Sequence, residues 1–343
     1  MKKNFKRRDF IKKAGLAGAA ATAVSAFPAP AIAADRVDIA IVTTWPRDFP
    51  GLGTGAQRIA DSITSMSDGK LTVKLYASGE LVPAFECFDA VSQGTAQMSH
   101  GASYYWINKN RSTPFFATVP GGLTAQEHDA WIHYGGGQEL WDELYSEFNL
   151  KGFLGGNSGV QMGGWFKKEI NSLEDFKGLK MRMPGLGAEV INRMGATAIA
   201  LPGGEIMPAL ESGAIDATEW VGPYNDLAFG FYQAAKFYYG PGFHEPGTHT
   251  ECMVNKNEYD ALPTNLQNIV EHACISENSF FNRMKLLRKE IKKEPTKKKE
   301  KILLPNDKEI LSQKKRVKTG IPLDQKTFLD LKKLSKKYFL NFF

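Results

Sequence analysis

The side chains in this sequence that could bind a small molecule or an ion are rich in oxygen and widely dispersed. They are tyrosine, tryptophan, amide, acidic and guanidinium groups: Tyr104, Tyr105, Trp106, Asn157, Gln161, Arg182, Glu219, Trp220 and Glu245. Arg182 ends a predicted strand, where a guanidinium with its fixed donors could hold a carboxylate through two hydrogen bonds. An isolated arginine more commonly forms a surface ion pair, so the residue type alone leaves both interpretations open.

The histidines do not form a catalytic zinc motif. The segment HEPGTH runs from His244 to His249 and contains residue types that bind zinc. A zinc-protease helix places its two histidines four residues apart, whereas these enclose Pro246 and Gly247, which oppose a helix. We therefore predict no catalytic zinc here. The sequence also has no P-loop and no nucleophile-elbow motif.

The string GLGTGA, with Gly51, Gly53 and Ala56, matches a dinucleotide-binding fingerprint in form. In that fingerprint the first glycine ends a strand, so that the following helix N-terminus meets the pyrophosphate. Here WPRDFP separates the strand from the glycines, and no acidic residue near the end of the next strand could hold a ribose. We predict no nucleotide site, and we expect these glycines to shape a loop at a ligand cleft.

The elements that must position the candidate residues alternate between strands and helices, which predicts an α/β fold. Strands are expected at 37–44, 68–76, 159–168, 179–183 and 214–220. Helices are expected at 56–66, 124–131, 140–148, 171–178, 187–195 and 203–213. Strand ends in such a chain gather at one edge of the sheet, which would bring the dispersed candidates together.

Local signals mark several of these helices. Two capping boxes favour helix starts: Thr124 with Glu127, and Ser172 with Asp175. Three glycines favour helix ends: Gly178, Gly195 and Gly213. The three cysteines, Cys87, Cys252 and Cys274, show no CxxC spacing, and we predict buried apolar thiols.

The net charge of +6 belongs to the two ends of the chain. Residues 1–33 carry seven basic and one acidic side chain, and residues 283–343 carry twenty basic and seven acidic ones. The body between them therefore has 16 basic and 29 acidic residues. A body this acidic is a poor candidate for binding nucleic acid, and we predict no nucleic-acid partner.

The N-terminus has the pattern of an export signal. Basic residues precede an apolar run over 14–33, which is too short and too weakly hydrophobic to span a bilayer and ends in a small-residue cleavage pattern after Ala33. The paired arginines in KRRDFIKKAG favour a twin-arginine signal, and a Sec signal is the alternative. We predict a signal peptide at 1–33 and a soluble mature protein in the periplasm.

Long segments of the chain, from about residue 35 to 272, resemble the solute receptors of TRAP transporters, the DctP-like family. The resemblance is carried by GELVPAFECFDAVSQGTAQMSHG, GGNSGVQMGGWFKKEINSLEDFKGLKMRMPG, MPALESGAIDATEWVGPYND and FYYGPGFHEPG. Within the family these segments are similar to the subgroup that binds 2-oxo monocarboxylates together with a cation. The resemblance implies a two-lobed fold like that of type II periplasmic binding proteins, with the ligand in a cleft between the lobes.

The resemblance also implies roles for individual residues. Arg182 corresponds to the arginine that pairs with the substrate carboxylate. Gln161, Glu219 and the Trp220 backbone carbonyl correspond to groups around a metal ion that also touches the substrate. Glu245 corresponds to an acid that completes the metal shell or the pocket wall.

Further residues are expected at the substrate itself. Tyr104 and Tyr105 match an aromatic stretch over the ligand, and Asn157, Gln161 and Trp220 are the other substrate-binding candidates. Ser103 stands where the family often has a third tyrosine, so the size limit of the ligand does not follow from the resemblance.

The chemistry of these ligands agrees with a hard cation. Carboxylate, amide and carbonyl oxygens suit Na⁺ or Ca²⁺ better than a soft transition metal. With Na⁺, the charges of the ion and Arg182 balance those of Glu219 and the substrate, which limits the cost of burying them. A 2-oxo acid could chelate the ion through its carboxylate and C2 oxygens.

We predict a receptor, not an enzyme, that closes its lobes over a small 2-oxo acid such as pyruvate and delivers it to the membrane permease subunits of a TRAP transporter. Two alternatives stay open: another carboxylate, such as lactate or a branched 2-oxo acid, in the same pocket, and an exported metal-dependent enzyme. Because related receptors can dimerise through C-terminal helices, a homodimer is also left open.

The lobes are expected at 35–160 with 250–343, and at 161–249. The last stretch, 283–343, is Lys-rich and atypical of the family. A frame-disrupted end, lineage-specific divergence and a basic patch for a membrane or partner are three interpretations of it.

Overall fold

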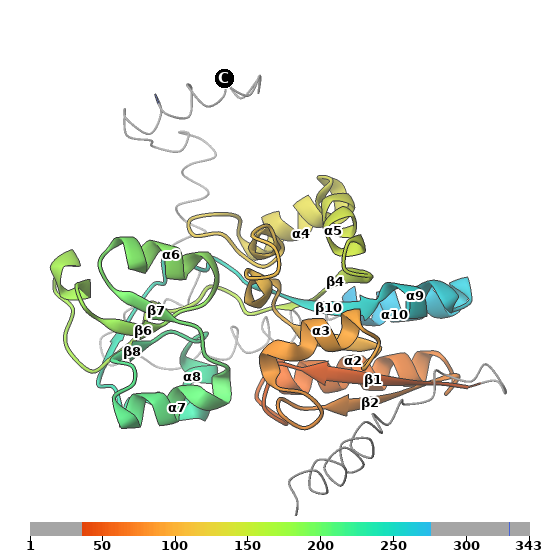
Figure 1. Cartoon of the computed structure of the whole chain (residues 1–343), viewed down its shortest axis with the longest axis horizontal. Coiled ribbons are helices and arrows are strands. Elements are labelled where there is room, and N and C mark those ends of the chain that lie inside the picture. Colours follow the sequence, from red (N-terminus) through yellow and green to blue (C-terminus); the bar gives the residue numbers. More distant parts are fainter. Residues whose placement is uncertain (1–35, 276–328, 330–343) are drawn as a thin grey trace, which may run out of the picture. The chain divides into compact units, whose positions relative to one another are not determined.

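The computed structural model of the protein describes residues 36–275 and Leu329, and residues 36–275 belong to one compact unit with two five-stranded sheets (Figure 1). The predicted signal peptide at 1–33 lies outside the described residues, as does the Lys-rich stretch 283–343 apart from Leu329. Every helix within the described part is too short or too polar to cross a membrane.

The first sheet forms around the apolar, β-branched N-terminal strand. Its strands, in spatial order, are β2 (Leu71–Tyr76), β1 (Val37–Thr43), β3 (Met98–Gly101), β10 (His249–Asn255) and β4 (Leu150–Asn157). β1 pairs in parallel with β2 and β3, and β10 pairs antiparallel with β3 and β4. Both faces are covered, because Ile39 and Ile41 enter one apolar cluster and Val42 enters another.

Helices cover the two faces of this sheet. Their bounds are α2 (Leu52–Met66), α3 (Cys87–Ser92), α5 (Gly137–Ser146), α9 (Lys256–Ala261) and α10 (Thr264–Ile275). Ile59 and Ile63 of α2 and Val270 of α10 share the cluster of Ile39 and Ile41. Trp141 and Tyr145 of α5 and Phe88 of α3 share the cluster of Val42.

The second sheet has shorter strands. They are β7 (Thr197–Ile199), β6 (Lys180–Arg182), β8 (Ala217–Thr218), β5 (Gly164–Phe166) and β9 (Phe237–Tyr239), in that order. Its longer helices are α6 (Gly185–Arg193), α7 (Gly203–Ser212) and α8 (Pro223–Phe229), with α6 on one side of the sheet and α7 and α8 on the other (Figure 1). The remaining helical segments of the described chain are η1 (Ala84–Glu86), η2 (Ser103–Trp106), η3 (Thr113–Phe116), α4 (Ala125–Tyr134), η4 (Leu173–Phe176) and η5 (Phe231–Gln233).

The chain crosses from the first sheet to the second through residues 158–163 and returns through 240–248. Backbone hydrogen bonds join these two crossings: Ser158 N–H donates to Thr248 O (2.8 Å) and Gln161 N–H donates to Glu245 O (3.1 Å). The two crossings therefore lie side by side and carry predicted site residues from distant parts of the sequence.

Direct contacts also join the elements of the two sheets. Phe49, before α2, stacks on Phe229 of α8 with ring centroids 4.4 Å apart. Asn225 of α8 donates a 2.6 Å hydrogen bond from its side chain to the Pro50 carbonyl. One apolar cluster consequently contains residues from both sheets, including Trp45 and Trp220.

Several element predictions are confirmed and others are wrong in extent. The predicted capping boxes begin α4 and η4, and Gly213 ends α7 in the left-handed conformation. The strand predicted at 159–168 is reduced to β5, because 159–163 forms the first crossing, and the strand predicted at 214–220 is reduced to the two residues of β8. Predicted helix 171–178 is a short 3₁₀ turn, and helix 140–148 starts three residues earlier and ends at Ser146.

The prediction that the glycines of GLGTGA shape a loop is wrong for Gly53. Gly53 is buried in the first turn of α2, where an added Cβ would lie 2.5 Å from the Pro46 carbonyl oxygen. Gly51 does precede the helix, with a positive φ of 75°. The predicted buried thiols are confirmed, since Cys87, Cys252 and Cys274 are free and buried.

Glu251 of β10 is a buried acid in the core of the first sheet. Its carboxylate accepts hydrogen bonds from the Trp106 indole and from the Tyr145 hydroxyl (2.7 Å). Burial raises the pKa of Glu251 from 4.5 to about 7. The folded chain therefore holds the proton of the Glu251 carboxyl group more tightly than the unfolded chain does. The contribution of this protonation to folding stability is fully present below about pH 4.5 and is lost as the pH rises through about 7.

We expect Glu251→Gln to remove this pH dependence. The amide carries no charge, and it can accept from Trp106 and donate to the Tyr145 oxygen. The variant's unfolding free energy should therefore exceed that of the wild type by more at about pH 8 than at about pH 5, and the two differences should themselves differ by roughly 1–3 kcal/mol. Urea unfolding at the two pH values measures the difference, with the exposed Glu174→Gln as the control. The same difference between variant and wild type at both pH values would contradict the prediction.

Candidate functional site

Arg182, at the end of β6, is the central charged residue of the site and is 1% exposed. Its Nε donates to the Leu201 carbonyl (3.2 Å), and its Nη1 donates to both the backbone carbonyl (3.2 Å) and the carboxylate of Glu219. Its Nη2 makes a longer contact of 3.5 Å with the Tyr105 hydroxyl, and its guanidinium carbon lies 5.0 Å from the Trp220 ring. The surface ion pair that the residue type allowed is therefore wrong.

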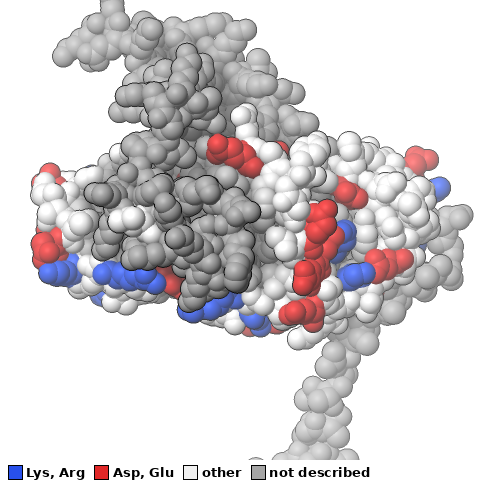
Figure 2. Space-filling model, turned by 90° about the horizontal axis from the view of Figure 1, so that it is seen from above, with Lys and Arg blue, Asp and Glu red and all other residues white. Residues whose placement is uncertain are grey.

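The ion pair between Arg182 and Glu219 differs from the pairs at the surface. Figure 2 shows exposed acidic and basic side chains among uncharged ones on one face of the described chain. Lys109 and Asp89, for example, are 37% and 40% exposed and contribute about 0–1 kcal/mol. Both Arg182 and Glu219 are 1% exposed, so loss of either partner would leave an uncompensated charge inside the protein.

Electrostatics keep Arg182 charged. Burial alone would lower the pKa of this guanidinium, but Glu219, together with Tyr105, Tyr104 and Glu245, outweighs burial and raises the pKa above its ordinary value. Burial raises the pKa of Tyr105, whose hydroxyl faces Arg182, and raises that of Tyr104 much further. Both tyrosines are therefore neutral hydrogen-bonding groups.

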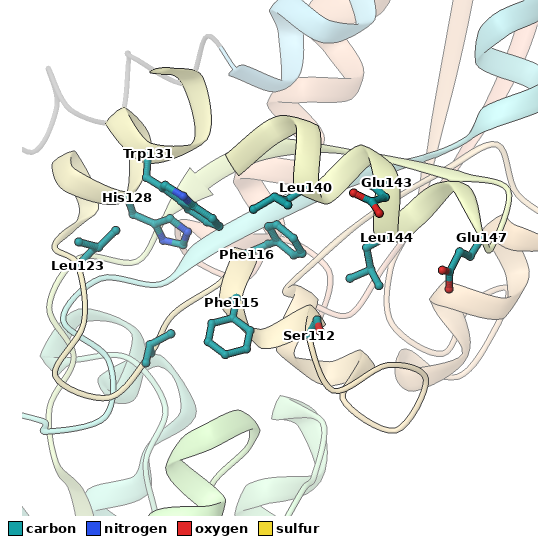
Figure 3. A pocket seen from close by; sticks show the side chains of 11 residues that line it. Ser112, Phe115, Phe116, Leu123, His128, Trp131, Leu140, Glu143, Leu144 and Glu147 are labelled. Atoms are coloured by element: carbon teal, nitrogen blue, oxygen red, sulfur yellow. The ribbon is translucent and has the colours of Figure 1, made fainter. Parts of the chain in front are cut away.

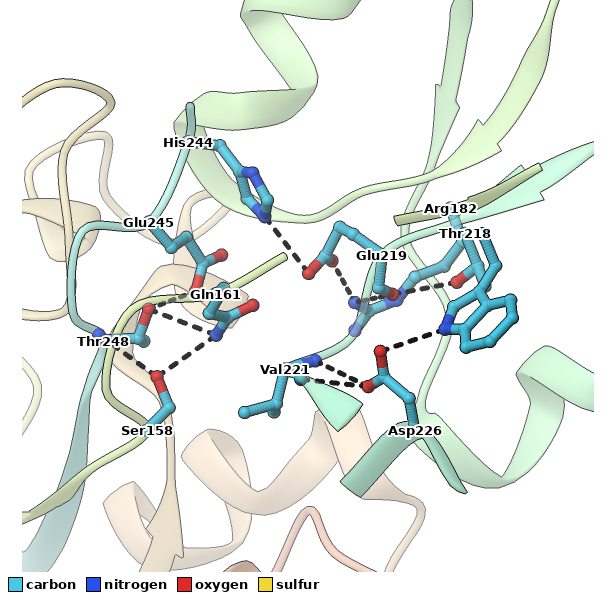
Figure 4. Close-up of polar contacts among 12 residues, drawn as sticks. Ser158, Gln161, Arg182, Thr218, Glu219, Val221, Asp226, His244, Glu245 and Thr248 are labelled. Atoms are coloured by element: carbon cyan, nitrogen blue, oxygen red, sulfur yellow. Dashed lines mark hydrogen bonds and ion pairs between the residues drawn. The ribbon is translucent and has the colours of Figure 1, made fainter. Parts of the chain in front are cut away.

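Glu219 follows β8 and uses its two carboxylate oxygens differently. Oε1 accepts from Arg182, and Oε2 lies 3.3 Å from His244 Nε2 (Figure 4). Burial by itself lowers the pKa of His244, but the hydrogen bond and the charge of Glu219 outweigh it and raise the pKa above its usual value. Glu219 thus links β8 to the second crossing.

The two crossings supply the other polar groups. The Gln161 amide nitrogen donates to Ser158 Oγ (3.2 Å) and Thr248 Oγ1 (3.4 Å), and Thr248 Oγ1 donates to the Glu245 carboxylate. Gln161 is 2% exposed, and its Oε1 has no hydrogen-bond partner among the described residues. Burial, together with the charge of Glu219, raises the pKa of Glu245 to about 7.

Asp226 of α8 fixes the backbone that follows Trp220. Its Oδ1 accepts from the N–H groups of Val221 and Gly222, both at 3.1 Å, and its Oδ2 accepts from the Trp165 indole at 3.0 Å (Figure 4). The Tyr238 hydroxyl donates to the same Oδ2 at 2.8 Å. A carboxylate with four donors holds the segment after β8 in one conformation.

The aromatic candidates lie on the side of the first sheet. Tyr104 and Tyr105, on η2, contact each other edge to face with ring centroids 4.8 Å apart. Trp45 contacts both Tyr105 (6.2 Å) and Trp220 (6.1 Å). Aromatic rings from the first sheet and Arg182 from the second thus face the same place.

The structure brings the predicted residues together to different degrees. Arg182 contacts Tyr105, Glu219 and Trp220 directly. One ligand atom each from Glu219, His244 and Glu245 lie within 4.8 Å of one another, and Gln161 reaches Glu245 through its backbone N–H.

Two candidates lie away from this cluster. Asn157 ends β4 and accepts from the Gly159 N–H (2.7 Å) at the start of the first crossing. Trp106 donates its indole N–H to Glu251 and packs in the core of the first sheet, so its inclusion among the binding candidates is wrong.

Three residues of the polar cluster are not among the binding candidates that the sequence predicts. They are His244, which the sequence presents only within a segment that does not fit a zinc motif, and Ser158 and Thr248. The signal for His244 was its position directly before Glu245, since neighbouring polar residues in an irregular segment can both reach one site.

An apolar cavity of about 560 Å³ lies elsewhere, between η3, α4 and α5 (Figure 3). It is lined by Ser112, Phe115, Phe116, Val119, Leu123, His128, Trp131, Leu140, Glu143, Leu144 and Glu147. None of the predicted binding residues lines it. The buried polar cluster around Arg182 is therefore the candidate site.

Comparison with known families gives a match over most of the chain. A family model described as "Bacterial extracellular solute-binding protein, family 7" (DctP) matches residues 41–318. The chain is 43% identical over 277 residues to the monocarboxylate 2-oxoacid-binding periplasmic protein of Nostoc sp.. That alignment covers 80% of this chain and 76% of the relative.

Two solved structures of TRAP periplasmic solute-binding proteins are similar to this chain. The protein from Colwellia psychrerythraea, with bound calcium and pyruvate, is 44% identical with a TM-score of 0.69, covering 74% of this chain and 80% of that one. The protein from Pseudoalteromonas atlantica, with bound sodium and pyruvate, is 37% identical with a TM-score of 0.71, covering 90% and 99%. The predicted α/β receptor fold is confirmed by these similarities.

Proposed function

We propose that this chain, which belongs to family 7 of the bacterial extracellular solute-binding proteins, captures a small 2-oxo acid such as pyruvate together with Na⁺ or Ca²⁺. The family consists of solute-binding proteins, so the chain is a receptor and not an enzyme. The observation that carries the proposal is the buried guanidinium of Arg182 beside the oxygen-rich cluster of Glu219, Gln161 and Glu245.

Arg182 would hold the substrate carboxylate. Its Nη2 makes the weakest of its hydrogen bonds, the 3.5 Å contact with Tyr105, and is therefore the donor most easily given to an anion. The Tyr105 hydroxyl would donate to the same carboxylate. Tyr104 and Trp220 would form aromatic walls around it, and Asn157 would line the pocket from β4.

The cation would bind to oxygen atoms on both crossings and after β8. The buried, unpartnered Oε1 of Gln161 fits such a ligand, because a buried amide oxygen without a partner is costly. Glu219, Glu245 and the Trp220 backbone carbonyl would complete the shell, a set of hard ligands suited to Na⁺ or Ca²⁺. When bound, the cation supplies a positive charge that draws the C2 oxygen of the acid.

The remaining parts of the proposal concern the setting of the receptor. The lobes would be 35–160 with 250–343, and 161–249, and they would close over the ligand by a hinge at the paired crossings. The signal peptide at 1–33, of twin-arginine type, would bring the protein to the periplasm. There it would pass its ligand to TRAP permease subunits, as a monomer or as a homodimer.

A thermal-shift panel tests this function. We expect pyruvate to raise the melting temperature more than lactate, a branched 2-oxo acid or propionate, and to do so with Na⁺ or Ca²⁺ present. A ligand at about 100 times its Kd stabilises by about 2.7 kcal/mol.

Three outcomes would contradict this proposal in part or in whole. A pyruvate shift that survives chelation and the removal of sodium would exclude the cation. A larger shift with lactate or the branched acid would move the assignment to that carboxylate, and no shift with any acid would contradict the function.

A further inference from the structure

We propose that His244, Glu219 and Glu245 form a binding site for a divalent transition-metal ion of the zinc class. One ligand atom from each of these residues lies within 4.8 Å of the other two, and all three residues are buried. The site shares Glu219, Glu245 and Gln161 with the proposed Na⁺ or Ca²⁺ shell but adds an imidazole nitrogen. The inference does not require the 2-oxo acid.

The distance between two of the ligand atoms matches tetrahedral coordination. His244 Nε2 and Glu219 Oε2 are 3.3 Å apart. Two ligands about 2.05 Å from a zinc ion, at the tetrahedral angle, are about 3.3 Å apart. An ion can therefore replace the hydrogen bond between these two atoms without a change in their separation, while Glu245 would move inward.

The other contacts leave the required atoms available. Arg182 occupies Oε1 of Glu219, so Oε2 is the oxygen that faces His244. Thr248 donates to Oε2 of Glu245, which leaves Oε1 for an ion. Glu219 follows β8, whereas His244 and Glu245 are neighbours in the second crossing, so two separate segments of the chain supply the ligand atoms.

Gln161, whose oxygen also supports the Na⁺ or Ca²⁺ shell, is a second indication of a ligand at this place. Its amide nitrogen bonds Ser158 and Thr248, and its oxygen faces the other way, toward Glu219 (Figure 4). That oxygen is buried and has no hydrogen-bond partner among the described residues. It is the fourth ligand of the proposed site.

The donor set decides the class of ion. Three oxygens alone suit Na⁺, Ca²⁺ or Mg²⁺, whereas an imidazole nitrogen favours Zn²⁺, Co²⁺ and their neighbours. The two carboxylates of Glu219 and Glu245 neutralise the charge of a dication. The positive charge of Arg182 then remains, and the carboxylate of a bound acid can cancel it. Transition ions would therefore compete with Na⁺ or Ca²⁺ for the same acids.

Cobalt provides a spectroscopic test with the purified, untagged protein after metal removal. Titration with Co²⁺ at about pH 8 should give the intense visible absorption of a four-coordinate site at one ion per chain, because binding releases the imidazole proton and is therefore favoured at higher pH. Zn²⁺ should abolish this absorption. His244→Gln should weaken Co²⁺ and Zn²⁺ binding by at least about tenfold, and His133→Gln, at an exposed histidine, should leave it unchanged.

The outcomes separate this inference from the proposed function. Weak absorption of the octahedral type would overturn the inference. Equal metal binding by the wild type and by a folded His244→Gln variant, with an unchanged circular dichroism spectrum, would show that His244 makes a hydrogen bond only and would overturn it as well. Calorimetry of pyruvate with Na⁺ on the same wild-type sample tests the receptor function separately. Cobalt binding without pyruvate binding would support the metal site and contradict the receptor assignment.

Discussion

Arg182→Ala is expected to weaken binding of a 2-oxo acid by roughly 2–5 kcal/mol, or about 30-fold to about 4,000-fold. The guanidinium is 1% exposed, so it would meet the substrate carboxylate where water does not screen the pair. Isothermal titration calorimetry with pyruvate in the presence of Na⁺ measures the change. Arg182→Lys, which keeps the charge but loses the planar fork of donors, should recover part of the affinity.

The structure offers a control for this experiment. Arg193, at the end of α6, is exposed, and Arg193→Ala removes the same charge from the surface of that helix without touching the site. Its affinity should match that of the wild type. An Arg182→Ala protein that remains folded by circular dichroism and binds pyruvate as tightly as the wild type would remove the basis of the proposed function.

Glu219→Gln is expected to have the second large effect, on stability and on the cation. The variant leaves the Arg182 guanidinium buried without its counter-charge, and breaking such a buried pair costs roughly 3–5 kcal/mol. It also removes the carboxylate that lies between Arg182 and His244, so pyruvate affinity should no longer depend on Na⁺ or Ca²⁺.

Two measurements check the Glu219 prediction. Urea unfolding gives the loss of stability, and pyruvate titrations with and without the cations give the cation dependence. Glu174→Gln changes an exposed glutamate of η4 and should alter neither quantity. A Glu219→Gln protein that keeps the full cation effect would show that the ion binds elsewhere.

Local structure was accessible from the sequence where neighbouring residues decide it. Thr124 with Glu127 begins α4 as predicted, because both partners of a capping box lie within one turn. Gly213 ends α7 because glycine reaches the left-handed conformation without steric cost. The amphipathic stripe that includes Ile59 and Ile63 likewise predicted α2, although not its first turn.

Elements that depend on distant partners were missed or overextended. β10 pairs antiparallel with β3 and β4, which are separated from it by about a hundred residues or more of chain, and it is absent from the strands that the sequence predicts. The segment 159–163 looks like a strand by composition, but Gln161 N–H donates to Glu245 of the returning crossing and Met162 N–H donates to Val221, after β8. Gly163 N–H donates to Tyr239 of β9, and the regular pairing of β5 begins at Gly164. Loops that connect sheets keep no periodic pattern, so sequence periodicity does not reveal them.

The sequence by itself determined the receptor family, through long motifs around Gln161, Arg182, Glu219 and Glu245, and it determined the helices whose ends are encoded by adjacent residues. Tertiary structure alone decided that Arg182 pairs directly with Glu219 and that His244 faces the same carboxylate. The physical reason is burial: a charge inside the protein must find a partner in three dimensions, and that partner is set by which strand ends and crossings meet.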